Sequence, residues 1–533
     1  MRVACVTALV VQLHYSRFMR YHRPAVLLIL LFAALTMTAA PQHEMKFRAK
    51  KQGLTNRYIV VLDDDRLGAS ASERAAATRD VLAELGILYR FKTKEVWTSA
   101  LRGFSMEATE AEARRLANDP KVRFVEQDAS FSNDSLLSAV PWCTQLSLGA
   151  NDPDRVNSFP KNTRPFPTSP QTITCANTNP TRSPECIDNW GLDRTDQAFL
   201  PRNQSYVYAN TGAGVHVYVM DSGIKASHRE FIGRIGTGYN AVNTSGLDDC
   251  LSHHHGTHVA SIIAGSTYGI AKGATIHPVK VVDACQAGSS GGTVGTYVAA
   301  FNWIAQNHQS PAVANLSGAN RTELVTSPSF VTAARGLIAS GVSFVQSAGN
   351  QGDDASAFSV SQYPDPTYNV QNAIVVGAVQ EIEEGPLLLD GRWVADATDP
   401  SYQDVFYSIP GGGAGGRLGY CRDRDGNIKP NHDQCGSNWG QSVTIWAPGA
   451  WITAAGWDDT VDAANAYCSL TGTSMAAPHV TGLIARYLQA HPTATPAQVK
   501  AALLAAARPG VLQTSGTWSI KSGSPNLLAQ PIP

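Results

Sequence analysis

Residues 472–480, with the sequence GTSMAAPHV, place a serine among small residues just before an apolar, helix-like run. Serine is a favoured helix N-cap residue, so Ser474 could simply accept a backbone N–H. It could also be a nucleophile, because its own N–H would point into the positive end of the helix dipole and its small neighbours would let a substrate backbone approach. Serine reacts poorly until an imidazole takes its proton. The role of Ser474 therefore depends on a base elsewhere in the chain.

Two other segments supply a candidate base and a carboxylate. Asp221 closes the apolar run GVHVYVMD, and His255 begins HGTHVAS, which reads as the start of a helix. A base that works near neutral pH needs a carboxylate to fix its tautomer. We therefore predict that Asp221 orients His255 and that His255 activates Ser474. Taken alone, an aspartate at a strand end is often only a turn former or a helix cap.

A fourth candidate follows another apolar run, in the segment SAGNQG. The side-chain amide of Asn350 could donate to the oxyanion that forms on a substrate carbonyl. The alternative is that Gly349 and Asn350 only make a left-handed turn.

Three consecutive histidines, 253–255, also suggest a metal site. Neighbouring side chains point in divergent directions, however, and the HExxH spacing is absent. We expect His253 and His254 to be solvated loop residues and His258 to pack inside the helix. A metal-dependent hydrolase using residues 253–255 lacks nearby carboxylate ligands at useful spacing, and activity that resists chelators would exclude it.

The motifs VYVMDSGI, HGTHVAS, SAGN and GTSMAAPHV occur in the order Asp, His, Asn, Ser. This order resembles the subtilisin-like serine proteases (peptidase S8), and most closely their proteinase K and aqualysin branch. The resemblance spans roughly residues 190–509. It implies a secreted serine endopeptidase that acts through an acyl-enzyme, with Asn350 in the oxyanion hole. The alternative is a catalytically silent, exported pseudoprotease that binds peptides.

The resemblance also implies the walls of a primary specificity pocket, formed by NLSGA (315–319) and SAGN (347–350). The family pattern in the first wall is Ser-Leu-Gly-Gly, whereas this chain has Ser-Gly-Ala-Asn, so the preferred side chain does not follow from it. The implied substrate-binding residues are Ser317, Gly318, Ala319, Ala348 and Gly349.

Further expectations concern cofactors and partners. The family resemblance implies an inhibitory I9-type propeptide and a disulfide between Cys250 and Cys285. We expect no required cofactor and allow for a structural calcium ion, which the family often binds. We expect polypeptide substrates, the propeptide as intramolecular inhibitor, no nucleic-acid partner and a monomer.

The elements that would position these residues are apolar, β-branched runs alternating with helix-like stretches. Buried strands that alternate with helices favour an α/β fold with a mostly parallel sheet flanked by helices. Ligand sites in such folds gather at the carboxyl ends of the strands, where Asp221 is expected. Before this unit, strand and helix patterns predict a small α+β, ferredoxin-like β-α-β-β-α-β domain, with one helix ending at Gly86.

Composition completes the organisation. The 533 residues exceed one ordinary core, and 42 Lys plus Arg against 43 Asp plus Glu give a net charge of −1, which offers no basic surplus for nucleic acid. The predicted units are a signal peptide at 1–40 (with Met19 as an alternative start), an inhibitory propeptide at 44–132, a loop-rich connector at 133–185, a catalytic domain at 186–515 and a C-terminal tail at 516–533.

Cysteine usage agrees with export. Nine cysteines are present, and eight remain once the segment with Cys5 is removed. An even number in an exported chain indicates disulfides. A disulfide between Cys421 and Cys435 would close the Gly-rich surface loop at 410–438.

Overall fold

The computed structural model describes most of two folded units and parts of the segments around them. None of the helices in the described ranges combines the length and the apolar character of a membrane span. The predicted signal segment, most of the connector, and Cys143, Cys175, Cys186, Cys250, Cys285, Cys421 and Cys435 lie outside the description. The described residues are 46–63, 70–130, 169, 171–172, 190–198, 203, 205–242, 246–249, 254–282, 292–318, 324, 326–360, 369–379, 436–450, 452–456, 467–470, 472–512 and 520–533.

The larger unit is built on a nine-stranded sheet with the order β17-β18-β14-β13-β12-β11-β8-β10-β9. From β14 to β9 every pairing is parallel, which confirms the predicted fold class. The strands are β8 (His216–Asp221), β9 (Tyr239–Asn240), β10 (Thr275–Lys280), β11 (Ala312–Leu316), β12 (Ser343–Ser347), β13 (Ile374–Val379), β14 (Ile445–Pro448), β17 (Arg508–Pro509) and β18 (Leu527–Leu528).

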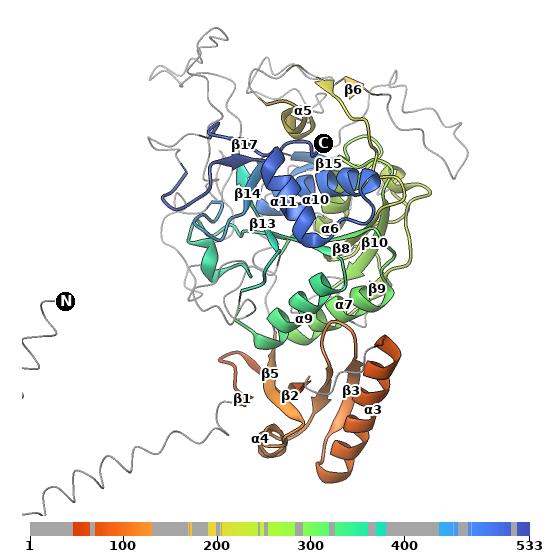
Figure 1. The fold of residues 1–533 in the computed structure, drawn as a ribbon, viewed down its shortest axis with the longest axis vertical. Coiled ribbons are helices and arrows are strands. Elements are labelled where there is room, and N and C mark those ends of the chain that lie inside the picture. Colours follow the sequence, from red (N-terminus) through yellow and green to blue (C-terminus); the bar gives the residue numbers. More distant parts are fainter. Residues whose placement is uncertain are drawn as a thin grey trace, which may run out of the picture.

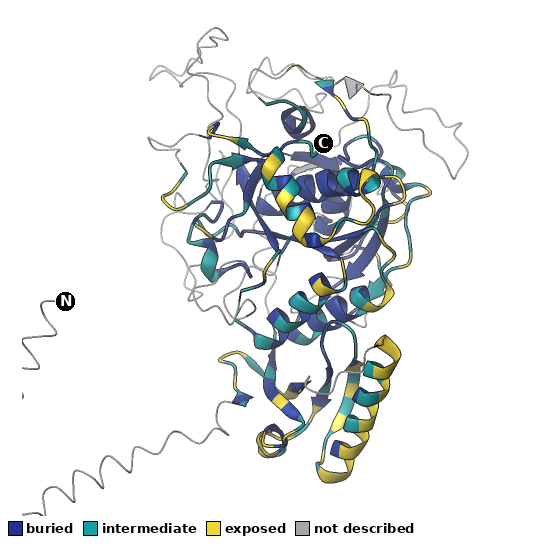
Figure 2. Cartoon of the chain, in the orientation of Figure 1, coloured by how far each residue is buried: buried dark blue, intermediate teal, exposed yellow. Residues whose placement is uncertain are grey.

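Helices cover both faces of this sheet (Figure 1). On one face lie α6 (His255–Ala264) and α10 (Thr473–Ala490), and on the other lie α7 (Val294–Asn307) and α9 (Pro328–Ala339). Because strand side chains alternate, β8 sends Val217 and Val219 into the core with α6 and α10, and Tyr218 and Met220 into the core with α7. Figure 2 shows the sheet and the helix surfaces turned toward it buried, with intermediate and exposed residues on the outer sides of the helices.

Smaller elements complete the unit. They are the antiparallel pair β15 (Ile452–Ala455) and β16 (Tyr467–Leu470), the pair β6 (Gln171–Thr172) and β7 (Ser205–Tyr206), helices α5 (Trp190–Asp196) and α11 (Pro496–Ala506), and 3-10 turns η3 (Arg229–Phe231) and η4 (Ala355–Ala357). The segment expected as a separate tail, 516–533, contributes β18 to the main sheet. There Leu528 pairs with Trp446 of β14, and β17 pairs with β18 in the antiparallel direction. The main sheet therefore includes residues beyond 515.

The smaller, N-terminal unit is a five-stranded sheet of order β1-β5-β2-β4-β3 with its own buried core. Its helix α3 continues past Gly86, where we had placed its end. An exposed glycine costs a helix only about 1 kcal/mol relative to alanine, which the surrounding turns offset. Its elements are β1 (Phe47–Arg48), β2 (Gly53–Leu62), α3 (Ala71–Leu88), β3 (Lys92–Trp97), β4 (Gly103–Glu107), α4 (Glu110–Ala117) and β5 (Val122–Ala129).

The N-terminal unit docks on α7 and α9 through two carboxylates of β5 (Figure 1). Glu126 Oε2 accepts from the N–H of Ser329 and from the Oγ of Ser327, both at 3.0 Å, at the start of α9. Asp128 Oδ1 accepts from the N–H of Gly295 at 3.0 Å, at the start of α7. The first N–H groups of a helix lack intrahelical partners, so each carboxylate satisfies such groups and meets the positive end of a helix dipole.

A loop of the N-terminal unit makes the second part of this contact. The side-chain oxygen of Asn302 on α7 accepts from the N–H groups of Thr98, Ser99 and Ala100 at 3.1, 2.8 and 3.2 Å. On α9, a Cβ added at Gly336 would lie 1.7 Å from the carbonyl oxygen of Ala100. Only glycine at position 336 therefore lets the loop approach this closely.

We expect Gly336→Ala to separate helix stability from docking. Alanine favours the helix by about 1 kcal/mol, but its methyl group would occupy the place of the Ala100 carbonyl. Hydrogen exchange should show the amides of residues 98–100 exchanging at least about tenfold faster, because their bonds to Asn302 are lost.

The matched control is Gly86→Ala in α3, where an added Cβ would meet nothing within 4 Å. It should leave the exchange of residues 98–100 unchanged. Equal exchange in the wild type and Gly336→Ala would contradict this docking geometry.

Candidate active site

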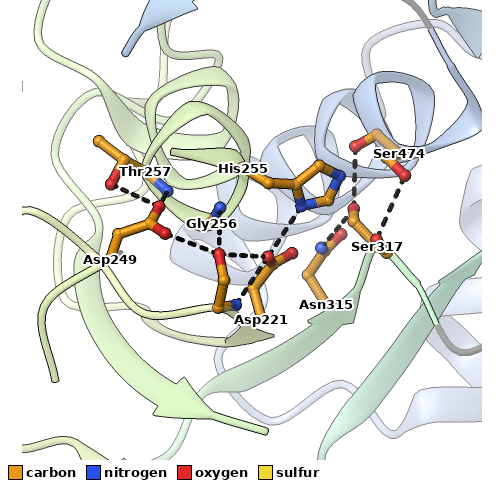
Figure 3. A network of polar contacts seen from close by, with 9 residues as sticks. Asp221, Asp249, His255, Gly256, Thr257, Asn315, Ser317 and Ser474 are labelled. Atoms are coloured by element: carbon orange, nitrogen blue, oxygen red, sulfur yellow. Dashed lines mark hydrogen bonds and ion pairs between the residues drawn. The ribbon is translucent and has the colours of Figure 1, made fainter. Parts of the chain in front are cut away.

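The centre of the site is a buried pair formed by Asp221, the last residue of β8, and His255, the first residue of α6 (Figure 3). The Nδ1 of His255 lies 2.8 Å from Asp221 Oδ1, and the two side chains are 3% and 2% exposed. A carboxylate that accepts from Nδ1–H leaves Nε2 as the basic nitrogen of a neutral imidazole. The pair therefore has the arrangement of a general base with its orienting acid.

A close contact of backbones brings the two residues together. A Cβ added at Gly256 would lie 2.2 Å from the carbonyl oxygen of Gly223 and 3.1 Å from Cβ of Asp221. Glycine at position 256 thus allows the start of α6 to abut the end of β8. The N-cap residue before it, His254, has a left-handed backbone with φ of 52°.

His254 was expected to be a solvated loop residue, and that prediction is wrong. It is buried, and its Nδ1 lies 3.2 Å from the carbonyl oxygen of Asp249. The left-handed backbone at the N-cap of α6 directs the side chain of His254 into the protein interior. His258 is buried in α6 as predicted, and His253 lies outside the described residues. Within the described part of the chain, no group of three or more His, Cys, Asp or Glu is arranged to hold a metal ion.

The environment makes the imidazole a stronger base. Burial by itself lowers the pKa of His255, but the charge of Asp221, its hydrogen bond and the charge of Asp249 outweigh that effect and raise the pKa above its usual value. Proton acceptance at Nε2 is thereby favoured.

Ser474 is the second residue of α10, and Gly472 is the N-cap, so the serine does not cap the helix. Figure 3 shows the imidazole of His255 between Asp221 and Ser474. The Ser474 Oγ donates to the carbonyl oxygen of Ser317 at 3.2 Å rather than to the imidazole. In proteins without bound substrate, catalytic hydrogen bonds are often long and form only in the substrate complex.

A proline in α10 explains a second link between these two serines. Pro478 has no N–H, so the carbonyl of Ser474, four residues earlier, lacks its helical donor. The Oγ of Ser317 donates to that carbonyl at 2.9 Å, and the Nδ2 of Asn315 donates to the same Oγ at 2.9 Å. The break in the helix ladder thus ties the start of α10 to the end of β11.

The amide of Asn350 is oriented by the residue before the serine. Asn350 Oδ1 accepts from both the N–H and the Oγ1 of Thr473, each at 2.9 Å. The carbonyl side of the amide is thus fixed against α10, and Nδ2 lies near Gly472, 3.1 Å from where a Cβ would be. Thr473 was missed in the sequence, where only its place beside Ser474 marked it.

Asn438 supports the loop that carries Asn350 from the opposite side, and no motif in the sequence marks this asparagine. Its Oδ1 accepts from the N–H groups of Gln351 and Asp353, both at 3.0 Å. Its Nδ2 donates to the carbonyl of Ala348 at 2.9 Å, and its own N–H donates to the carbonyl of Gly349 at 2.8 Å. One buried amide therefore fixes both ends of the loop.

The expected pocket residues lie just after the carboxyl ends of two neighbouring strands. Ser317 and Gly318 follow β11, and Ala348 and Gly349 follow its parallel neighbour β12. The N–H of Gly349 donates to Thr473 Oγ1 at 3.1 Å, so both segments contact the start of α10. Ala319 lies outside the described residues.

Family comparisons agree with this arrangement. A model of the subtilase family (peptidase S8) matches residues 212–523, and a model of peptidase inhibitor I9 matches residues 57–132. The chain belongs to the subtilase family, and it is a serine-type endopeptidase made with an I9 propeptide.

Individual relatives extend the comparison. The chain is 34% identical over 491 residues to an extracellular serine proteinase of Thermus sp. (strain Rt41A), covering 90% of each chain. It is 29% identical over 468 residues to alkaline serine exoprotease A of Vibrio alginolyticus, covering 87% of this chain and 66% of that one. The solved structure of fervidolysin from Fervidobacterium pennivorans shares the fold at 17% identity with a TM-score of 0.54, covering 92% of this chain and 63% of that one.

The orientation of Asn350 generates a prediction for its loss. Replacing it with leucine removes the Nδ2 donor, and we expect kcat to fall by about 10²–10³-fold with little change in KM, the size of effect that subtilisin itself shows for one oxyanion donor. Steady-state kinetics on a peptide amide would measure it, with concentrations fixed by active-site titration. A kcat equal to that of the wild type would refute the role.

Proposed function

We propose that the chain is a secreted endopeptidase whose catalytic residues are Asp221, His255 and Ser474. The observation that carries this assignment is the buried 2.8 Å contact between Asp221 and His255, beside a serine at the start of α10. Serine reactivity requires such a base, and the base requires such a carboxylate.

The proposed reaction is an acyl transfer in two halves. His255 takes the proton of Ser474 as Oγ attacks the peptide carbonyl, which forms the bond to carbon and places a negative charge on the carbonyl oxygen. His255 then protonates the leaving amine, and a water repeats the sequence to release the acid. Asp221 stays ionised and stabilises the imidazolium.

The oxyanion is proposed to lie between two donors, the Nδ2 of Asn350 and the N–H of Ser474. The second belongs to the first turn of α10, where N–H groups lack helical partners and the helix dipole is positive. The contacts of Thr473 with Asn350 Oδ1 support this assignment, because an amide held in advance loses no energy to reorientation during the reaction.

Substrate recognition is assigned to the segments after β11 and β12. We propose that Ser317, Gly318 and Ala319 form one wall of the primary pocket and that Ala348 and Gly349 form the other. The substrates are polypeptides, and the N-terminal unit is the chain's own inhibitor, as the I9 match supports.

Export and self-processing belong to the same proposal. Its support is the apolar N-terminal segment after Arg20 and Arg23, and the printed name of the Thermus relative, an extracellular proteinase. Cleavage in the segment after residue 130 would separate the inhibitor from the catalytic unit. A silent pseudoprotease gains no support from the comparisons.

We expect Ser474→Ala to abolish both self-cleavage and labelling by an organophosphorus reagent. The full chain and the variant would be expressed side by side, and their products analysed by N-terminal sequencing and mass spectrometry. Ser340→Ala is the comparison variant, since it removes a hydroxyl at the end of α9, on the other face of the sheet, and leaves the site untouched. Labelling that persists in Ser474→Ala would end the assignment.

A structural calcium ion is proposed at α5. The Asp193 Oδ1 and the Gln197 Oε1 both approach the N–H of Asn203, at 3.4 and 3.2 Å. Asp196 Oδ1 is buried and has no hydrogen-bond partner in the described structure. Carboxylate and amide oxygens are among the ligand types that calcium prefers, and we propose Asp193, Asp196 and Gln197 as its ligands. Its role would be to hold this segment, with no part in the chemistry.

We therefore expect calcium to raise the melting temperature, by an amount equivalent to about 2.7 kcal/mol at a hundredfold excess over Kd. Removal by a chelator should reverse the shift, and Asp196→Asn should remove most of it. Asp248→Asn, a change to an exposed carboxylate outside α5, should respond like the wild type. A melting temperature indifferent to calcium would overturn the site.

A further inference from the structure

A second buried carboxylate lies behind the triad. Asp249 is 2% exposed, and its Oδ2 accepts from the N–H and the Oγ1 of Thr257 at 2.8 and 2.9 Å. Its Oδ1 accepts from the Oγ of Ser222 at 2.8 Å (Figure 3). Thr257 stands two residues after His255 on α6, and Ser222 follows Asp221, so Asp249 contacts a neighbour of each.

The hydroxyl of Ser222 stands between the two carboxylates. Its Oγ lies 2.8 Å from Asp249 Oδ1 and 3.2 Å from Asp221 Oδ1, and it accepts from the N–H of Gly256 at 3.0 Å. A hydroxyl has one proton to donate, so it can serve only one carboxylate fully at a time. The shorter distance indicates that it serves Asp249 when both acids are ionised.

Protonation of Asp249 would change this choice. A carboxyl group protonated at Oδ1 donates to the Oγ of Ser222, and the hydroxyl proton then turns toward Asp221. The hydroxyl would then join the N–H of Ser222 and the Nδ1 of His255 on Asp221 Oδ1, the oxygen that receives all the described hydrogen bonds of Asp221. An extra donor stabilises the charge of Asp221 and makes it a weaker partner for the imidazole.

We propose that Asp249 is a positioning residue for the reaction. The protonation state of Asp249 determines whether the hydroxyl of Ser222 donates to Asp249 or to Asp221. It thereby sets the pH range in which His255 acts as a base. The inference rests on the proposed catalytic roles of Asp221, His255 and Ser474.

The charges around Asp249 determine the direction of the effect. Burial, followed by the charge of Asp221, raises the pKa of Asp249 to about 6, against the opposing hydrogen bonds from Thr257 and Ser222. The two nearby lysines contact its neighbour: Lys225 Nζ lies 3.4 Å from Asp248 Oδ2, and Lys280 Nζ donates to the Asp248 carbonyl at 2.8 Å. Among the described residues, the titratable and charged groups near this site are Asp221 on β8, His254 and His255 at the start of α6, Lys225, Asp248, and Lys280 on β10.

The protonation of Asp249 and the protonation of His255 are therefore anticooperative. Ionised Asp249 raises the pKa of His255, and a protonated imidazole favours the ionised form of Asp249. As the pH falls, protonation of either group makes protonation of the other harder. The acidic limb of kcat/KM should accordingly be broader than a one-proton curve.

The test is the pH profile of kcat/KM for the mature wild type and Asp249→Asn. The substitution removes the charge of Asp249. The asparagine oxygen can still accept from Thr257, and its NH₂ group can donate to the Oγ of Ser222. We expect the acidic limb of the variant to narrow to a one-proton curve and its midpoint to move to lower pH by roughly half a unit or more. Asp248→Asn, which changes the adjacent exposed acid, should leave the limb in place.

Two further variants guard against a folding failure of Asp249→Asn. Thr257→Val removes one donor to Asp249 and keeps the carboxylate, so the limb should move in the same direction. In a Ser222→Ala background, the Asp249→Asn shift should shrink, because the shared hydroxyl is gone. The inference would be overturned if neither Asp249→Asn nor Thr257→Val moved the acidic limb of kcat/KM. It would also be overturned if Asp249→Asn moved the limb by the same amount in the Ser222→Ala background as in the wild type. Wild-type activity that is lost in Ser474→Ala tests the proposed function separately.

Discussion

The buried hydrogen bond between Asp221 and His255 is the contact on which the rest of the site depends. A carboxylate removed from water is costly unless donors replace its hydration, and the backbone N–H of Ser222 at 2.8 Å does part of this. The imidazole supplies another donor and acquires a raised pKa as a result. For the bond to form, a helix must begin against the end of a strand, which Gly256 permits.

Other elements extend this constraint to the reacting atoms. Parallel strands β8, β11 and β12 deliver Asp221, Ser317 and the Asn350 loop to one edge of the sheet, as the geometry of such sheets requires. Helix α10 meets them with its N-terminus, fixed through Ser317 because Pro478 leaves a carbonyl without its helical donor. The N-terminal unit uses related chemistry on α7 and α9, where carboxylates of β5 bind two further helix starts.

Residue type and position made Asp221, His255, Asn350 and Ser474 candidates, since each stands where an apolar run ends or a helix begins, and the family resemblance of their four motifs joined them into one predicted site. The parallel sheet was accessible because β8, β10, β12 and β13 coincide with short apolar runs that alternate with helix-like stretches. The supporting residues were not. Thr473 and Asn438 are common polar types whose roles arise from partners far along the chain. Asp249 acts through Ser222 and Thr257, which only the fold brings to its two oxygens. His254 was misjudged because its burial follows from the turn into α6, which its residue type does not reveal. The pairing of β18 involves two residues, too few for a recognisable pattern.

The most direct test of the account is the tautomer of His255 in the mature protein, read by NMR from histidine labelled with ¹⁵N. The contact with Asp221 predicts that, above the pH at which the ring is protonated, the proton resides on Nδ1 and Nε2 is bare, with the Nδ1 proton resonance shifted far downfield. Asp221→Asn should remove the downfield shift. A neutral imidazole in the wild type with its proton on Nε2 would contradict the account, because that nitrogen could not accept the proton of Ser474.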